Sequence, residues 1–152
     1  GCMLELQPGG NVFTPAEASY LKSQLLARLA TVAPDGTVQN SPVGFFLNAE
    51  LNTFDIWGQR MGRTKKFTNV ASYPRVALVI DDLVSVSPWI ARGMEIRGLA
   101  EPLSGLEPPR PYYSREVIRI HPYKIISWGV EEGGAYTSRR VDTPSQTKRA
   151  PA

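Results

Sequence analysis

The stretch LARLATVAPDGTVQNSPVGFFLN, residues 26–48, decides the fold class of this chain. Residues 30–33 are a short β-prone run, the turn sequence PDG interrupts it at 34–36, and residues 37–46 resume an extended pattern. Asp-Gly between two β-rich segments is a strong hairpin signal. The stretch therefore predicts two antiparallel strands joined by a tight turn.

A helix is predicted immediately before this hairpin. Thr14 is a favourable N-cap residue, Pro15 suits the first helical position, and Glu17 completes a T-x-x-E capping box. Leucines recur every four residues over 21–29, which is the spacing of one helical face. We therefore expect the helix to end near Arg28.

Later runs predict the remaining strands, over residues 53–57, 75–80, 94–100 and 117–128, the last of them bent at His121-Pro122. A short helix is expected over 64–72, because the residue before Pro74 avoids the helical region. Strands joined by short turns favour antiparallel pairing, and closure into a barrel removes exposed edges. The expectation is a mainly β fold of six antiparallel strands, with one N-terminal helix and one short helix after the third strand.

The length of 152 residues suits a single domain. We expect a flexible lead-in over 1–12, a folded cofactor-binding domain over 13–137 and a flexible basic tail over 138–152. No apolar run approaches the ~20 residues that a membrane-spanning helix needs, so we expect no membrane span.

Cysteine and histidine each occur once, as Cys2 and His121. This count excludes an intrachain disulfide and a Cys/His zinc site, and we expect a reducing, cytoplasmic compartment. The net charge of +3 is compatible with an anionic ligand but is too small to indicate nucleic acid.

The segment GQRMGRTKKFTN, residues 58–69, concentrates positive charge where a strand ends and a helix begins. A helix start binds anions through its free N–H groups and dipole. Lys65 and Lys66 in the first turn are unfavourable there unless an anion is present. The segment is either a solvated basic turn or a phosphate-sized anion site.

The chain resembles the pyridoxamine 5′-phosphate oxidase-like family of flavin-binding split β-barrels over about residues 13–130. The resemblance lies in the segment 26–48, in GRTKKFTNVASYPRVALVIDD at 62–82, and in VIRIHPYKIISWG at 117–129. The branch that it resembles most uses coenzyme F420, a deazaflavin. The resemblance implies a six-stranded split β-barrel that forms a homodimer, with the cofactor site at the subunit interface.

In this family the cofactor phosphate lies at a Lys-x-x-Asn motif, which Lys66 and Asn69 match here. Arg63, Thr64 and Lys65 are neighbours that could share this role. Family members often have arginine two residues before the motif lysine, where this chain has Thr64, so the phosphate ligands are open among these residues.

The resemblance also implies residues that contact the cofactor ring. These are Asn40, Ser41, Pro42 and Val43 along its edge, Ile56, Trp57 and Gly58 beneath it, and Trp128 from the partner subunit. Two alternatives stay open, because Pro42-Val43-Gly44 also fits an ordinary strand kink and Trp128 a half-buried core residue.

The sequence shows no nucleophile–base triad and no metal motif, so the catalytic residues are unknown and a cofactor would carry the chemistry. The resemblance implies an oxidoreductase that uses reduced F420 to transfer hydride to a conjugated or electron-poor small molecule. The alternatives are an FMN-dependent enzyme of this family and a non-catalytic flavin or deazaflavin carrier. The basic track through Arg60, Arg63 and Arg75 favours F420, whose tail carries more negative charge than the phosphate of FMN. A nucleic-acid-binding barrel is disfavoured, because the aromatic residues are not interleaved with the basic ones.

Overall fold

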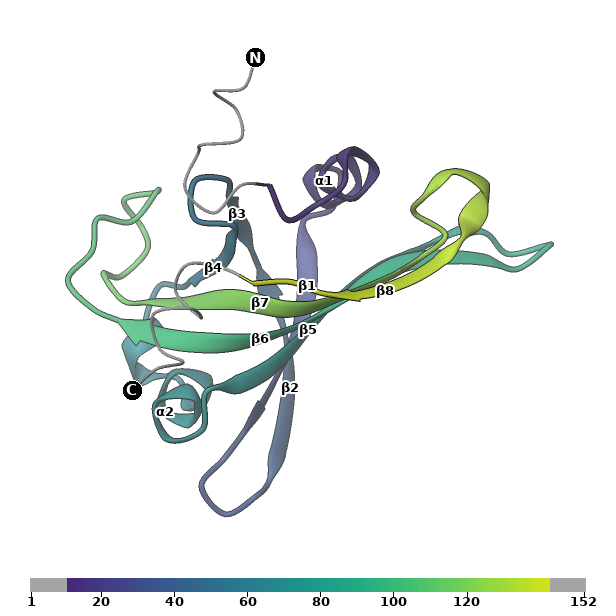
Figure 1. The fold of residues 1–152 in the computed structure, drawn as a ribbon. Coiled ribbons are helices and arrows are strands. Elements are labelled where there is room, and N and C mark those ends of the chain that lie inside the picture. Colours follow the sequence, from purple (N-terminus) through teal and green to yellow (C-terminus); the bar gives the residue numbers. More distant parts are fainter. Residues whose placement is uncertain (1–10, 143–152) are drawn as a thin grey trace.

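The computed structural model describes residues 11–142, which form one curled antiparallel sheet with two α-helices (Figure 1). The helices are α1 (Pro15–Lys22) and α2 (Lys65–Ser72). The strands are β1 (Leu26–Val32), β2 (Val38–Gly44), β3 (Phe46–Asn48), β4 (Thr53–Trp57), β5 (Arg75–Ser85), β6 (Ile90–Leu103), β7 (Val117–Trp128) and β8 (Tyr136–Arg140). The 3-10 turns η2 (Met61–Arg63) and η3 (Glu132–Gly134) complete the described elements.

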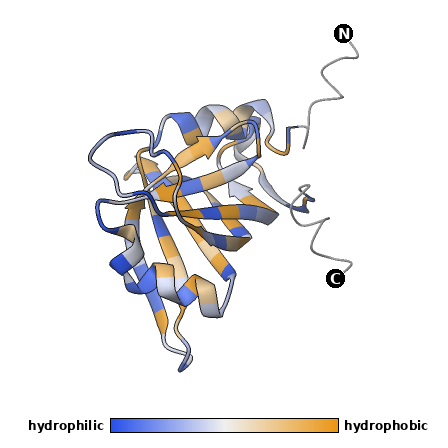
Figure 2. Cartoon of the chain, turned by 90° about the vertical axis from the view of Figure 1, so that its left-hand side faces the viewer, coloured by the Kyte–Doolittle hydropathy of each residue, from blue (hydrophilic) through white to orange (hydrophobic). Residues whose placement is uncertain are grey.

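The strand order is β2-β1-β5-β6-β7-β4-β3, and β8 pairs with β7. Apolar and polar residues alternate along the strands (Figure 2), so the sheet curls with one face around a core. That core holds fully buried side chains such as Phe54, Leu78, Ile96 and Ile120. The predicted mainly β, antiparallel split-barrel class is confirmed, with eight strands in the described part of the chain rather than six.

The hairpin predicted over 30–46 is present with a first strand that begins earlier, at Leu26, and the preceding helix is shorter than predicted. Thr14 and Glu17 form the full capping box, but α1 ends at Lys22. Leu25 is 84% exposed and β1 begins at Leu26, so the expected end near Arg28 is wrong. The recurring leucines span two elements: Leu21 belongs to the helix, while Leu29 faces the core from a strand.

The two strands predicted over 75–80 and 94–100 are longer than expected, because most of residues 81–93 extends the sheet. β5 continues to Ser85 and β6 starts at Ile90, which leaves only residues 86–89 as the turn. The two strands form a long hairpin arm that projects from the body (Figure 1). Asp82 pairs with Arg92 across the arm, and the Arg92 guanidinium donates to its carboxylate at 2.9 Å. This cross-strand pairing keeps the charged residues Asp81 and Asp82 within a strand.

Two further boundaries differ from the expectation. β7 is continuous through His121-Pro122, and the irregularity appears as a register shift in the β6–β7 ladder between Arg97 and Gly98. The predicted domain end at residue 137 falls inside β8, which pairs with β7 up to Arg140. Residues 1–10 of the expected lead-in and 143–152 of the expected tail lie outside the described residues. Within 11–142, neither helix has the length and hydropathy to cross a membrane.

Candidate functional site

The start of α2 presents unused hydrogen-bond donors. Thr64 is the N-cap, and its hydroxyl accepts from the Phe67 N–H at 3.3 Å and donates to the Met61 carbonyl at 2.7 Å. The backbone N–H groups of Lys65 and Lys66 donate to no acceptor within residues 11–142. Free N–H groups at this end of a helix attract anions. The Thr64 side chain is therefore occupied by capping, and the N–H groups of Lys65 and Lys66 stay available to a ligand.

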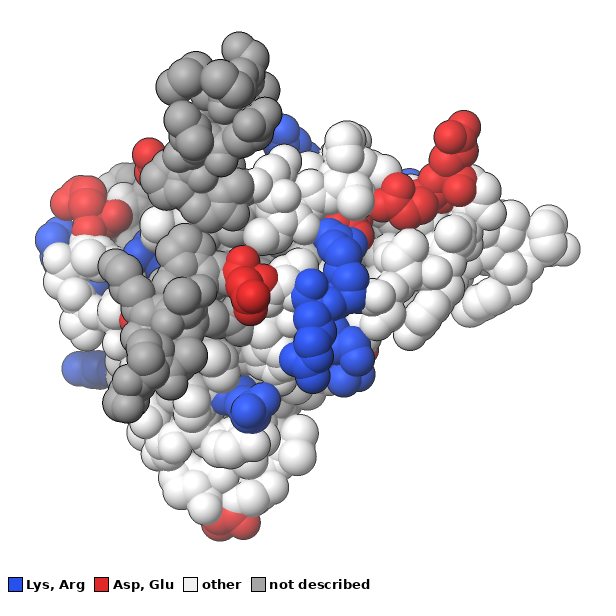
Figure 3. All heavy atoms as spheres, in the orientation of Figure 1, with Lys and Arg blue, Asp and Glu red and all other residues white. Residues whose placement is uncertain are grey.

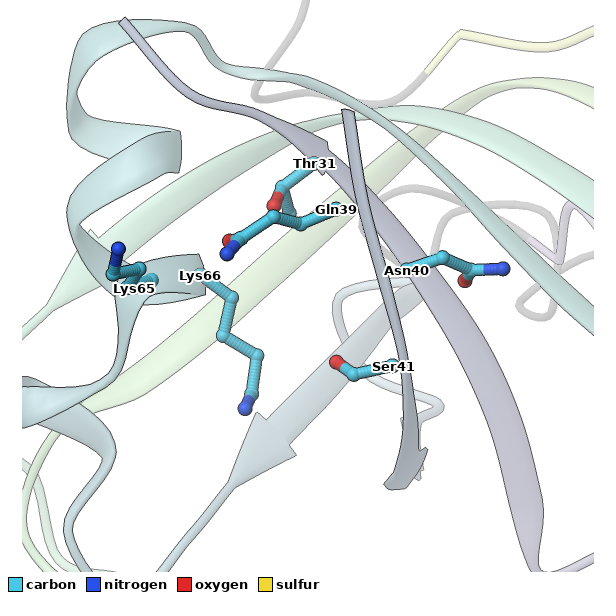
Figure 4. Close-up of a pocket in the computed structure, with 6 residues that line it drawn as sticks. All are labelled: Thr31, Gln39, Asn40, Ser41, Lys65 and Lys66. Carbon is cyan, nitrogen blue, oxygen red and sulfur yellow. The ribbon is translucent and has the colours of Figure 1, made fainter. Parts of the chain in front are cut away.

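A cavity of about 410 Å³ opens beside these lysines. Its lining consists of Thr31, Gln39, Asn40, Ser41, Lys65 and Lys66. In Figure 4 the Lys66 side chain extends toward β2 alongside Ser41, while Lys65 points away from the strands. The volume falls in the range of small-molecule sites. Lys66 is thus the lysine that reaches into the cavity.

Asn69 fastens α2 to the β1–β2 hairpin. Its side chain is buried, and its amide nitrogen donates to the Thr31 hydroxyl at 3.0 Å and to the Gln39 carbonyl oxygen at 2.7 Å. Lys66 lies one turn earlier on the same helix. The Lys-x-x-Asn motif therefore combines a lysine that enters the cavity with an asparagine that fixes the helix against the sheet.

The register of the β1–β2 ladder divides the predicted ring-edge residues between the two faces of the hairpin. Ser41 pairs with Leu29 and Val43 with Ala27, so both lie on the face of the core. Val43 is buried in the core, whereas Ser41 reaches the cavity. Pro42 is exposed on the opposite face, and the Asn40 side chain turns away from Lys66 although Asn40 borders the cavity (Figure 4).

The predicted residues around the end of β4 lie apart from this cavity. The Ile56 side chain is fully buried in the core, so it offers no surface to a ligand. Trp57 is half-buried, and the Gly58 carbonyl accepts a hydrogen bond from the Ser114 hydroxyl at 3.0 Å. Arg63 lies at a second cavity of about 610 Å³. That cavity is lined by Gln59, Arg60, Gly62, Arg63, Ser114 and Glu116.

Trp128 lies at the base of the β5–β6 arm. It pairs with Gly93, and a Cβ atom at Gly93 would come within 2.7 Å of the Trp128 ring. The glycine therefore lets the indole lie flat across the neighbouring strand. Within one chain Trp128 does not line the Lys66 cavity.

A cross-strand row of cations occupies the outer face of the sheet. Arg97 pairs with Lys124, and Lys124 pairs with Arg140, on three adjacent strands. Figure 3 shows Lys and Arg side chains gathered over this part of β6, β7 and β8. Glu95 accepts from Arg97 at 2.9 Å and offsets part of the repulsion between like charges.

The comparison with protein families matches residues 13–129 to the pyridoxamine 5′-phosphate oxidase family model. The chain belongs to this family. It is 44% identical over 120 residues to 5a,11a-dehydrotetracycline/5a,11a-dehydrooxytetracycline reductase of Streptomyces rimosus, which covers 78% of this chain and 84% of that relative.

Two solved structures share the fold of this chain. A protein named F420 reductase superposes with a TM-score of 0.51 at 23% identity, over 67% of this chain and 89% of that one. An FMN-binding, pyridoxamine 5′-phosphate oxidase-related protein of Nostoc punctiforme gives 0.57 at 10% identity, over 86% and 98%. At these identities the likeness establishes the fold alone.

Thr31 and Gln39 are the lining residues that the sequence analysis missed. Strand alternation was the available signal, because Gln39 shares a face with Ser41 and a hairpin turn at 34–36 sets Thr31 opposite Gln39. The six lining residues include no carboxylate, imidazole or thiol. The cavity can hold an anion, whereas bond-making chemistry there requires a bound cofactor.

Proposed function

We propose that this protein is an oxidoreductase that binds coenzyme F420 at the Lys66 cavity and reduces a conjugated or electron-poor organic substrate by hydride transfer. One observation carries the proposal. A cationic side chain and two free N–H groups converge on a cavity of ligand size at the start of α2. This combination fits the phosphate group of a flavin-type cofactor, because charge-assisted hydrogen bonds and the helix dipole act at one place.

The residues of the cavity would divide the work of binding. Lys66 and the free N–H groups would hold the phosphate, and Ser41 offers a hydroxyl on the opposite wall. Asn69 keeps Lys66 in position through its bonds to Thr31 and Gln39. The bound deazaflavin would supply the hydride from its central ring carbon, and fixing the ring beside the substrate supplies the orientation that such a transfer needs.

The distribution of charge favours F420 over FMN. Residues 58–66 contain four cations and no carboxylate, and two of these cations, Arg60 and Arg63, line the second cavity next to α2. FMN ends in one phosphate, whereas F420 continues into a phosphodiester and several carboxylates. The name of the related reductase supports a reductase activity, and the neighbour named F420 reductase makes F420 a candidate cofactor. The FMN-binding neighbour makes FMN the second candidate.

We also propose that the protein acts as a homodimer with the cofactor site at the subunit interface. The outer face of the β1–β2 hairpin exposes large apolar side chains, such as Leu26 and Val38, which no part of residues 11–142 covers. Exposed apolar surface of this kind marks a contact site.

The deciding experiment titrates the purified protein with F420 and with FMN, and then adds unsaturated ketones to the bound, reduced cofactor. F420 should bind more tightly than FMN, and the ketone should oxidise the reduced form. Failure of both cofactors to bind below ~100 μM, or about −5.5 kcal/mol, would contradict the proposal. Binding without oxidation by any substrate would identify a carrier instead.

A further inference from the structure

The tip of the β5–β6 arm is an uncharged, exposed apolar segment, LVSVSPWI at residues 83–90. Trp89 and Val86 are each 69% exposed, and Leu83, Val84 and Ile90 are exposed as well. Hairpin tips in water are normally polar, and apolar patches left in solvent mark sites of association. This segment therefore lacks a partner within residues 11–142.

The Lys66 cavity, in contrast, lacks apolar side chains. All six of its lining residues are polar or charged. Sites for planar, ring-containing ligands are mostly apolar, with a few polar groups that fix orientation. The cavity as one chain builds it can anchor a phosphate, but no aliphatic or aromatic residue lines it to stack on a cofactor ring.

One chain cannot bring these two features together. Figure 1 shows the arm tip and α2 at opposite ends of the curled sheet, and the arm is part of the continuous strands β5 and β6. An apolar wall supplied by the arm must therefore come from a second copy.

The charges at the two ends of the molecule complement each other. Residues 129–135, beside the arm, contain Glu131 and Glu132 and no cation, and Figure 3 shows acidic side chains over this turn between β7 and β8. Residues 58–66 at the α2 end contain four cations, and the Glu116 carboxylate, which accepts from the Gly62 N–H at 3.3 Å, offsets only part of this positive charge. A two-fold arrangement that sets the arm end of each copy against the α2 end of the other joins opposite charges twice.

We propose that the arm tip of each protomer packs against the Lys66 cavity of a second copy, where Trp89 supplies the apolar wall for the cofactor ring. This inference rests on the proposed function, and it assigns the missing half of the site to a named segment of the partner. Trp89 is exposed in the free chain, so its indole could stack on the cofactor ring without giving up packing contacts within its own chain.

The test is complementation between two defective variants. Lys66→Ala damages the cavity, and Trp89→Ala damages the arm. Each alone should weaken binding of F420, or of FMN as the simpler probe, at least about tenfold. Mixed and allowed to exchange subunits, they form dimers in which one site combines an intact cavity with an intact arm. About one quarter of all sites should then regain wild-type affinity, since random exchange makes half of the dimers mixed.

Tyr112→Ala is the matched control, because Tyr112 is also an exposed aromatic residue but lies in the loop before β7. It should leave affinity and dimer mass unchanged. Mixed dimers, verified by mass, that bind no better than the parent variants would overturn the proposal.

The proposed function can fail separately. If the wild-type protein binds neither cofactor, the role of Trp89 as a ring wall is wrong together with that function. In that case the oligomeric state, measured by sedimentation, tests the docking of the arm by itself. A wild-type dimer that Trp89→Asp converts to monomer supports arm docking, and a monomeric wild type, or a dimer that Trp89→Asp leaves intact, refutes it.

Discussion

Charged side chains are paired in one corner of the molecule and left without ionic partners in another. Where α1 meets β8, the fully buried Glu17 carboxylate accepts two hydrogen bonds from the Arg139 guanidinium, at 2.7 and 2.8 Å, and one from the Thr14 N–H at 2.9 Å. At the start of α2, Lys65 and Lys66 have no carboxylate within ion-pair distance in the described part of the chain. One corner satisfies every charge, and the other leaves its cations available.

This difference separates residues that maintain the fold from residues that serve a ligand. A buried carboxylate that loses its partner destabilises the protein strongly, because the charge cannot return to water. Lysines in the first turn of a helix have the reverse character, since they are mildly unfavourable until an anion arrives. The following substitutions test whether stability and binding divide between the two corners in this way.

Arg139→Ala should have the largest effect on stability. It leaves Glu17 buried without its guanidinium partner, and we expect a loss of about 3 kcal/mol in the free energy of unfolding. Urea unfolding followed by circular dichroism measures it, with Arg140→Ala on the adjacent, exposed position as the control. A loss as small as that of the control would show that the buried ion pair does not hold this corner.

Lys66→Ala should weaken cofactor binding and leave stability nearly unchanged. We expect cofactor affinity to fall by roughly 1.5–3 kcal/mol, the value of a hydrogen bond to a charged group, with stability unchanged within about 0.5 kcal/mol. Isothermal titration and thermal unfolding measure the two quantities. Lys22→Ala, at an exposed lysine in the last turn of α1, controls for loss of net charge. A large loss of stability would mark Lys66 as structural.

Asn69→Ala should lower stability, as Arg139→Ala does, because Asn69 is the residue of the Lys-x-x-Asn motif that maintains the fold. Its amide makes two hydrogen bonds that tie α2 to the hairpin, and Thr31 would be left buried without this partner. We expect a loss of about 1–3 kcal/mol in stability. Any loss of affinity should follow from displacement of Lys66, so Asn69→Ala and Lys66→Ala together should weaken binding by less than the sum of the two changes.

Asp82 gives the smallest effect, and it depends on pH. Hydrogen bonds from the Arg92 guanidinium, at 2.9 and 3.2 Å, hold the pKa of Asp82 below its ordinary value, and the Tyr20 hydroxyl adds a further bond. A carboxyl whose pKa is lower in the folded state stabilises the protein above its unfolded pKa, near 3.9, and loses that contribution as the pH falls through the folded value.

The comparison of wild type with Asp82→Asn isolates this contribution. Because the pair is partly exposed, we expect a difference of only about 1 kcal/mol at neutral pH, which shrinks on acidification below about pH 4. Urea midpoints across this range measure it. A difference that stays constant on acidification would attribute the effect to packing rather than to charge.

Much of the fold could be predicted from the sequence where neighbouring residues determine the structure. The capping box of Thr14 and Glu17 and the turn at Asp35-Gly36 form as expected, because each depends on contacts over a few residues. The end of α1 could not be predicted, since Leu26 and the residues after it gain more from pairing with two other strands than from another helical turn.

The site shows the same division. The basic segment indicated an anion site at the start of α2, and four of the predicted residues line one cavity there: Asn40, Ser41, Lys65 and Lys66. The sequence could not show that Pro42 lies on the exposed face and Val43 in the core, because these faces depend on the register of β1 against β2. Ile56 was predicted to lie beneath the cofactor ring, but its side chain is buried in the hydrophobic core.

The sequence by itself determined the hairpin, the capping box of α1 and the cationic start of α2, because short-range hydrogen bonding and local charge fix these features. Only the tertiary structure decided that Asn69 would grip Thr31 and Gln39, that β8 would join the sheet, and that an apolar arm would end in solvent. These outcomes depend on pairing between residues far apart in the chain, and the packing of the whole sheet selects that pairing.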